Sequence, residues 1–156
     1  MAGYWLMKSE PDECSIDDLA AAPGQVLPWT GVRNYQARNF MRDHMQVGDP
    51  VLFYHSSCPQ TGIAGLACVA GDCAPDATQF DPASPYHDPK SRADKPRWLQ
   101  RPVRFVRKTR LVGLPELRRT PALHTMRVLQ PGNRLSITPV SADEWAVVLA
   151  LVDTPR

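Results

Sequence analysis

The sequence has little cysteine and no motif that binds a metal or hydrolyses a nucleotide. Its four cysteines lie at irregular spacings, with no C-x-x-C pair and no histidines at zinc-finger distances. We therefore expect reduced thiols, no metal site and no cofactor. Neither the P-loop pattern G-x-x-x-x-G-K-[ST] nor a G-x-G-x-x-G turn ahead of a helix is present. These absences argue against a nucleotide hydrolase.

Long hydrophobic runs are also missing. No stretch of about 18 consecutive apolar residues occurs, so the sequence predicts no membrane-spanning helix and no membrane partner. The opening MAGYWLMKSEP lacks the basic start and long apolar core of a secretory signal. We therefore expect a cytoplasmic protein.

The chain does have enough apolar sequence for one folded domain. Its 156 residues are 43% hydrophobic and 22% charged, which are ordinary values for a globular domain. A chain of this length buries a core without disulfides or metal. Because no internal repeat or linker interrupts it, we predict a single domain over residues 1–156. The sequence does not specify an oligomeric state.

Short apolar runs alternate with helix signals along the chain. Helices are predicted after Ser15, from Asn34 to Gly48, and after the capping box that begins at Ser141. Five strands are predicted to begin near residues 3, 51, 62, 102 and 135. This order favours an α+β fold, with a curved mixed sheet or open β-barrel of about five to six strands and flanking helices.

Residues 71–98 differ in kind from the rest of the chain. They contain five prolines and two Asp-Pro steps, with little hydrophobic periodicity. Such long segments in compact domains are usually functional or disordered. The segment ends in KPRWLQ, which contains Trp98.

Positive charge is concentrated in one part of the chain. Residues 1–89 contain four basic and eleven acidic side chains, whereas residues 90–156 contain fourteen and five. Eleven of the basic residues fall within residues 90–119. This clustering is expected of a surface that meets phosphates. The alternative is a solvated strand and loop whose arginines pair with the acidic part of the chain.

The four tryptophans divide into two pairs. Trp5 lies in a predicted strand and Trp145 on the apolar stripe of a predicted helix, so we expect both in the core. Trp29 and Trp98 are predicted to lie in polar, proline-containing loops beside arginines. Two such rings can hold a flat heteroaromatic base, because stacking contributes about 1–3 kcal/mol per base. The alternative is that each ring caps the core beneath a loop.

Support for catalysis is weak. His55 ends one predicted strand and Cys58 follows it, so the two could act as a base and the nucleophile that it activates. A buried cysteine and a strand-end histidine are commoner without catalysis. We therefore predict a protein that is not an enzyme. Two alternatives stay open, namely an enzyme acting on a nucleotide or RNA through these two residues, and a protein-interaction module whose exposed tryptophans anchor a peptide.

Several longer motifs carry a family resemblance. In order along nearly the whole chain they are YWLMKSEPDECSIDDL, WTGVRNYQARNFMRDHMQVGDPVLFYHSS, GIAGLACV, PYHDPKS, PRW and NRLSITPVSADEW. On these motifs the sequence resembles the EVE domain family. The resemblance implies a PUA-like fold, related to the YTH readers of methylated adenine in RNA. It also implies non-enzymatic binding of DNA or RNA through a modified base, chiefly a 5-modified cytosine in DNA, which is flipped into an aromatic pocket.

The resemblance also implies site residues. The base pocket would have Trp29 and Thr30 as one wall, Asn34 at its floor and Trp98 as the opposing wall. Its full set is Lys8, Ser9, Glu10, Trp29, Thr30, Asn34, Ser56, Ser57 and Trp98. Basic residues near these positions are expected to hold the phosphates, which set position and salt dependence rather than base identity. They are Arg33, Arg38, Lys90, Arg92, Lys95 and Arg97.

Overall fold

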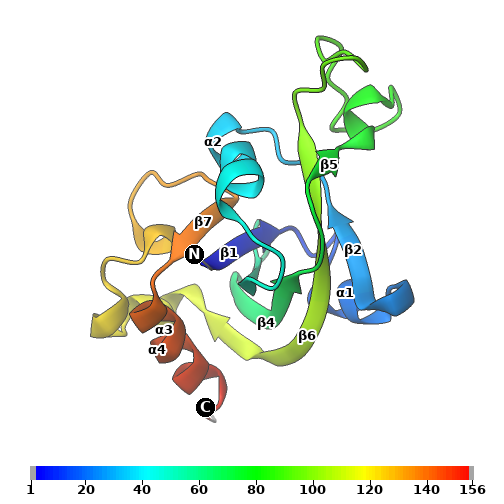
Figure 1. Ribbon diagram of the computed structural model, residues 1–156. Helices are drawn as coiled ribbons and strands as arrows, with labels where there is room; N and C mark the ends of the chain where they lie inside the picture. Colours follow the sequence, from blue (N-terminus) through cyan, green and yellow to red (C-terminus); the bar gives the residue numbers. More distant parts are fainter. Residues whose placement is uncertain (1–2, 155–156) are drawn as a thin grey trace.

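A curved mixed sheet organises the chain in the computed structural model, which describes residues 3–154 (Figure 1). The strands run in the order β2-β6-β4-β3-β1-β7, and the short β5 pairs with β6 beside this path. The strands are Tyr4–Ser9 (β1), Val26–Trp29 (β2), Pro50–His55 (β3), Gly62–Val69 (β4), Ala74–Pro75 (β5), Leu99–Gly113 (β6) and Ile137–Val140 (β7).

Strand β1 lies inside the sheet because it has a partner on each side. It pairs parallel with β3, where Trp5 lies opposite Val51, and antiparallel with β7, where Tyr4 lies opposite Val140. Parallel neighbours end at the same edge of a sheet. The carboxyl ends of β1 and β3 therefore meet, and Ser9 pairs with His55 there.

Strand β6 gives the sheet its curvature. It spans 15 residues and pairs with both β2 and β4. Its register with β4 shifts at two irregular points, and such bulges bend and twist a strand. Gly65 of β4 lies against Ile16, since an added Cβ would come within 2.5 Å of the Ile16 side chain. Glycine is needed there to let a helix approach the strand.

Short helices cover the sheet and its edges. They are α1 (Ile16–Ala21), α2 (Tyr35–Asn39), α3 (Leu114–Arg118) and α4 (Ala142–Val152). The predicted caps are confirmed, since Ser15 caps α1 and Ser141 forms a capping box with Glu144 at α4. Helix α2 continues directly into a π-helical turn over Phe40–His44 (η2). The helix predicted from Asn34 to Gly48 therefore ends at His44. Single 3-10 turns occupy Pro23–Gln25 (η1), Ala77–Phe80 (η3), Pro121–Leu123 (η4) and Arg127–Leu129 (η5).

Core side chains cover both faces of the central strands. Trp5 and Met7 of β1 belong to a cluster under α1 and α2, whereas Leu6 belongs to a second cluster with residues of α3 and α4. Successive side chains of a strand point to opposite faces, so β1 supplies both cores. Trp145, which was predicted in the core, is partly buried and packs against the second cluster, with its ring centroid 5.1 Å from that of Tyr4.

The predicted α+β class and mixed sheet are confirmed, with two additional strands. Residues Val26–Trp29 form the edge strand β2, so Trp29 ends a strand instead of lying in a loop. The long segment after β4 contains β5 and the turn η3 and is held against β6. No helix between residues 3 and 154 is long and apolar enough to cross a membrane. Within the same range no three His, Cys, Asp or Glu side chains gather as metal ligands would.

Candidate functional site

A cavity of about 650 Å³ opens beside the carboxyl ends of β1 and β3. Both polar and aromatic side chains line it, and they come from segments far apart in the sequence. The segments are the end of β1 with the following turn, Leu19 of α1, β2 with residues 30–32, Phe53 with residues 56–57, part of the loop 78–86, and Arg134 with Ser136 before β7.

Seven of the nine residues predicted for the base pocket line this cavity. Five of them are brought together because β1 and β3 end side by side, and the Ser56 amide donates a 2.9 Å hydrogen bond to the Ser9 carbonyl. The other two, Trp29 and Thr30, reach the cavity from the end of β2. Ser57, next in the chain, has a φ of 54° and lies in the left-handed region that non-glycine residues rarely adopt. The seven residues are Lys8, Ser9, Glu10, Trp29, Thr30, Ser56 and Ser57.

Trp29 joins the cavity to the core. Its half-buried ring lines the cavity and packs against the core cluster of α1 and α2. The ring meets Phe53 nearly edge to face, with centroids 5.4 Å apart. The indole is therefore fixed from behind while part of it faces the cavity.

Tyr86 is a cavity residue to which the sequence analysis gave no role. Its hydroxyl donates a short hydrogen bond to the Glu13 carboxylate, and its ring lies against Gly31. Burial and the Glu13 contact raise the pKa of Tyr86 to about 12, so the phenol stays neutral. The motif PYHDPKS was the available signal, but the segment has no periodicity that indicates which side chain faces inward.

Arg134 and Ser136 are two further lining residues that were missed. The Lys8 amide donates a 2.8 Å hydrogen bond to the Ser136 carbonyl, which fixes this segment beside β1. Burial lowers the pKa of the Lys8 ammonium. Because Lys8 and Arg134 share the cavity with Glu10 and Glu13, its charge is mixed. Such a lining suits a planar polar group better than a phosphate.

Asn34 and Trp98 lie elsewhere, so the pocket positions predicted for them do not fit this geometry. The Asn34 side-chain oxygen accepts hydrogen bonds from the amides of Gln36 and Ala37 and caps α2. Trp98 is 6% exposed, and its indole nitrogen donates a 2.8 Å hydrogen bond to Asp88. Its ring stacks on Tyr35 rather than facing the cavity.

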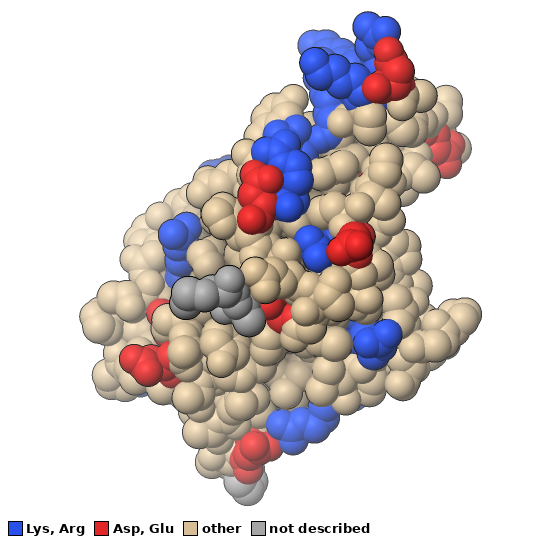
Figure 2. Space-filling view, in the orientation of Figure 1, with Lys and Arg blue, Asp and Glu red and all other residues tan. Residues whose placement is uncertain are grey.

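The residues predicted to bind phosphate fall into two groups. Arg33 and Arg38 are engaged inside the protein, since Arg33 bonds to the Tyr86 carbonyl and Arg38 to the Arg97 carbonyl. The other four lie on the projecting loop between β5 and β6, where basic side chains gather at the top of Figure 2. Two of its residues are paired, Arg92 with Asp94 at 2.9 Å and Arg97 with Asp88 at 3.8 Å. The four are Lys90, Arg92, Lys95 and Arg97.

The candidate catalytic pair lines a different cavity, of about 530 Å³. His55 Nε2 accepts a 3.1 Å hydrogen bond from the Ile16 amide at the start of α1. Within residues 3–154 no hydrogen bond joins His55 to Cys58. The Nε2 atom of His55 thus accepts a hydrogen bond from α1, and His55 and Cys58 do not form the hydrogen-bonded pair by which a histidine activates a thiol.

The curved mixed sheet, its flanking helices and the cavity at the end of β1 define an α+β protein of PUA-like fold. The sequence relationship is more specific than the fold. The chain belongs to the EVE domain family, whose model matches residues 3–151. The resemblance seen in the sequence motifs is thereby confirmed.

Similarity to individual relatives and solved structures extends along nearly the whole chain. Human thymocyte nuclear protein 1 is 42% identical over 97% of this chain and 74% of its own length. A hypothetical protein from Leishmania major superposes with a TM-score of 0.93 at 45% identity, covering 98% of this chain and 96% of that chain. Human THYN1 protein in complex with 5-methylcytosine-containing DNA superposes with a TM-score of 0.91 at 41% identity, covering 99% of this chain and all (100%) of that chain.

Proposed function

We propose that the protein is a non-enzymatic reader that binds nucleic acid through one modified base, with 5-methylcytosine in DNA as the leading ligand. The observation that carries the proposal is the human relative, 41% identical over 99% of this chain, which was crystallised with DNA containing 5-methylcytosine. The same fold in this chain contains a cavity with an aromatic wall. The base would enter that cavity flipped out of its stack.

The chemistry of the cavity supports a base as the ligand. Flipping a base costs a few kcal/mol, which stacking and hydrogen bonds to its edge must offset. The Trp29 and Tyr86 rings offer aromatic surface for stacking. Lys8 and the nearby serine hydroxyls provide donors for ring carbonyl and nitrogen atoms, while the Glu10 carboxylate accepts from an exocyclic amino group.

The basic loop tip supports a nucleic acid rather than a free base. Lys90 and Lys95 are exposed there, and Arg134 lies at the cavity itself. Contacts of this kind neutralise phosphates, so affinity falls as salt rises. The loop tip would attract nucleic acid of any sequence, and the cavity would distinguish one base from another.

The test is a binding panel of matched oligonucleotides. Fluorescence anisotropy would compare 5-methylcytosine with cytosine in otherwise identical single-stranded and duplex DNA, and in RNA, at two salt concentrations. One buried methyl group is worth about 0.8 kcal/mol, so we expect roughly fourfold tighter binding to the methylated DNA. Equal binding to both bases in every context would overturn the proposal. A preference confined to RNA would change the ligand from DNA to RNA.

A second measurement tests the absence of catalysis. The methylated oligonucleotide would be incubated with the protein and its mass determined. We expect an unchanged mass, because burial and the Asp18 charge raise the pKa of Cys14, the thiol that lines the cavity, and so keep it in its weakly nucleophilic protonated form. A mass change that disappears in Cys58→Ala would instead support the enzyme alternative.

A further inference from the structure

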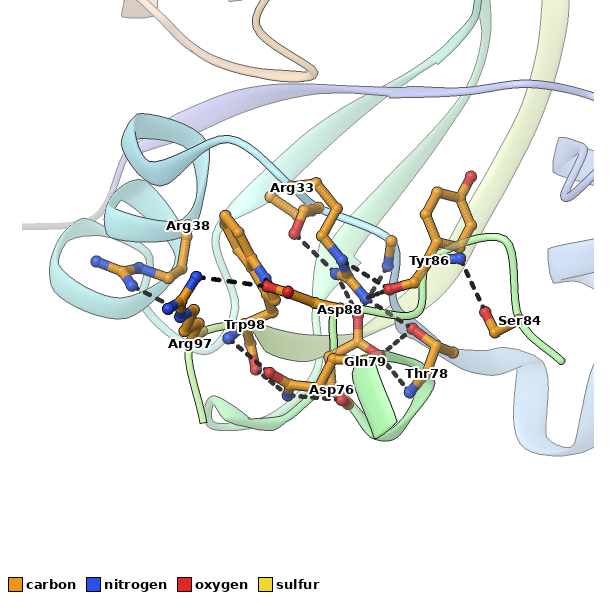
Figure 3. A network of polar contacts seen from close by, with 12 residues as sticks. Arg33, Arg38, Asp76, Thr78, Gln79, Ser84, Tyr86, Asp88, Arg97 and Trp98 are labelled. Carbon is orange, nitrogen blue, oxygen red and sulfur yellow. Dashed lines mark hydrogen bonds and ion pairs between the residues drawn. The ribbon is translucent and has the colours of Figure 1, made fainter. Parts of the chain in front are cut away.

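Five planar side chains stack in a continuous series that ends at the base cavity. We call this series the stacked ladder; it consists of Arg38, Tyr35, Trp98, Arg33 and Tyr86 in that order. Figure 3 labels four of its members, Arg38, Trp98, Arg33 and Tyr86. The Arg38 guanidinium lies 4.7 Å from the Tyr35 ring centre, and Tyr35 stacks on Trp98 at 4.8 Å. The Arg33 guanidinium lies 5.5 Å from Trp98 and 5.6 Å from Tyr86. The ladder thus connects α2 with the cavity wall.

Arg33 lies between Trp98 and Tyr86 in the ladder, and its whole guanidinium group is used within the protein. Nε and Nη2 donate to the Tyr86 carbonyl at 3.0 and 2.6 Å. Nη1 donates to Asp76 at 3.1 Å and to the Val32 carbonyl at 2.9 Å, and Nη2 also donates to Thr78 at 3.1 Å. A guanidinium group has five N–H donors, and these five contacts engage them all. None is left for a phosphate.

The acceptors of Arg33 are themselves fixed. Asp76 is fully buried and accepts hydrogen bonds from the Gly31 and Thr78 amides, both at 2.8 Å. Although burial opposes it, hydrogen bonds from Thr78, Gly31 and Arg33 lower the pKa of Asp76 below its usual value. The carboxylate is therefore ionised and holds Arg33 and the start of the loop together.

Gln79 joins the start of this loop to its end at Trp98. This buried amide donates to the Asp76 and Trp98 carbonyls at 2.7 and 2.8 Å and accepts from the Trp98 amide at 3.0 Å. The loop that bears the basic tip is thus joined at both ends to the ladder. The tip and Tyr86 belong to one hydrogen-bonded unit.

We propose that Arg33 is a positioning residue that sets Tyr86 as a wall of the base cavity and ties this wall to the basic loop tip. This inference rests on the proposed function and assigns to Arg33 a role other than phosphate binding. Preorganisation of the loop lowers the entropy lost when a nucleic acid binds. The wall and the phosphate contacts then engage the ligand together.

Arg33→Lys separates this role from a phosphate contact. Lysine keeps the charge but lacks the planar fork needed to stack and to reach Tyr86, Asp76 and Thr78 at once. We expect affinity for the methylated oligonucleotide to fall toward that for the unmethylated one, while the dependence of log affinity on log salt keeps its slope. A phosphate contact would give the reverse, since Arg33→Lys would then keep the affinity ratio and Arg33→Gln would lower the slope by about one.

Two matched variants calibrate the measurement. Arg104→Lys makes the same substitution at an exposed position of β6, and we expect it to keep the affinity ratio. Lys95→Gln removes a charge at the exposed loop tip, and we expect a lower salt slope with the ratio retained. If Arg104→Lys lowered the ratio of the affinities for methylated and unmethylated oligonucleotide as much as Arg33→Lys does, the assignment would be overturned, because the effect would not be specific to the ladder.

Amide hydrogen exchange of the free protein tests the inference without a ligand. In Arg33→Lys we expect faster exchange over residues 76–88 and unchanged exchange in β1 and β3. Unchanged exchange over residues 76–88 would overturn the positioning role. If wild-type protein shows no preference for the modified base, the proposed function fails, yet the exchange result still decides whether Arg33 fixes the loop.

Discussion

The ring of Trp29 meets the ring of Phe53 at 76°, with centroids 5.4 Å apart, so the cavity wall is braced by the sheet beneath it. Removing the Trp29 ring therefore has two effects. Trp29→Ala loses a stacking surface worth about 1–3 kcal/mol, so we expect affinity for the methylated oligonucleotide to fall roughly 5- to 150-fold. It also lowers stability, because an aromatic pair contributes about 0.5–1.5 kcal/mol beyond its buried area.

The control for this prediction separates binding from stability. Trp145→Ala removes a partly buried indole that packs on Tyr4 in the other cluster, away from the cavity. We expect it to lower the unfolding temperature without changing the affinity of the folded protein. Similar losses of affinity in both variants would show that Trp29 acts through stability alone.

Gly31 is predicted to be sensitive to a single methyl group. Its φ is 81°, and an added Cβ would come within 2.8 Å of the Tyr86 ring. Gly31→Ala therefore lowers the free energy of unfolding by about 1–2 kcal/mol, because alanine is strained in the left-handed region, and it also displaces the cavity wall. We expect a lower unfolding temperature together with weaker binding to the methylated oligonucleotide.

Gly48 provides the matched control. Its φ is 93°, but nothing lies within 4 Å of an added Cβ. Gly48→Ala should lower the free energy of unfolding by a similar amount and leave the affinity for the methylated oligonucleotide at the wild-type value. The explanation fails if calorimetry and anisotropy show the same pair of effects for both glycines.

Arg101 belongs to the basic segment of the sequence yet supports the fold. It is 5% exposed and donates to the carbonyls of Gly71, Met41 and Met45 at 2.9–3.0 Å. Arg101→Met leaves these carbonyls without their charged donor, so we expect a loss of about 3 kcal/mol in the free energy of unfolding. Urea titration measures it. The exposed Arg104→Met should change stability by less than about 0.5 kcal/mol, and an equal loss there would refute the argument.

His55 is expected to make stability depend on pH. Burial lowers its pKa below 6.5, helped by Lys108 and opposed by Asp17 and Asp18. Because the fold disfavours the protonated ring, the stabilising contribution is complete above pH 6.5 and is lost as the pH falls below this value and through the lowered pKa. The protonated ring also cannot accept the hydrogen bond from Ile16.

Thermal unfolding of His55→Gln as a function of pH tests this contribution. We expect a shallower loss of stability on acidification than in the wild type, since glutamine does not titrate. The exposed His87→Gln is the control and should leave the His55 contribution in place. Identical pH profiles for wild type and His55→Gln would show that His55 does not couple to folding.

The parts of the fold that were predictable depend on neighbours in the sequence. The caps at Ser15 and Ser141 bond to residues three positions ahead, and the apolar runs of β1, β3 and β4 fill both faces of the sheet. Strand β2 escaped prediction because it has four residues and includes Pro28, which is tolerated at the sheet edge.

The parts of the site that were not predictable depend on distant partners. Arg33 beside Trp29 suggested a phosphate contact, but its acceptors Asp76 and Tyr86 lie more than forty positions away. Trp98 is likewise directed by Asp88 and Tyr35 rather than by its neighbours. Motif composition therefore indicated which segments form the cavity, and three-dimensional hydrogen bonding decided which side chains face it.

The pairing of β1 with β7 has a consequence for the order of folding. Tyr4 lies opposite Val140, and the cavity needs both Lys8 and Ser136. Contacts between residues so far apart along the chain form slowly, because a large loop must close first. We expect a refolding chain to gain its β3 and β4 hairpin before the cavity exists. Recovery of oligonucleotide binding would thus mark the last stage of folding, after the far-ultraviolet signal of the sheet has largely returned.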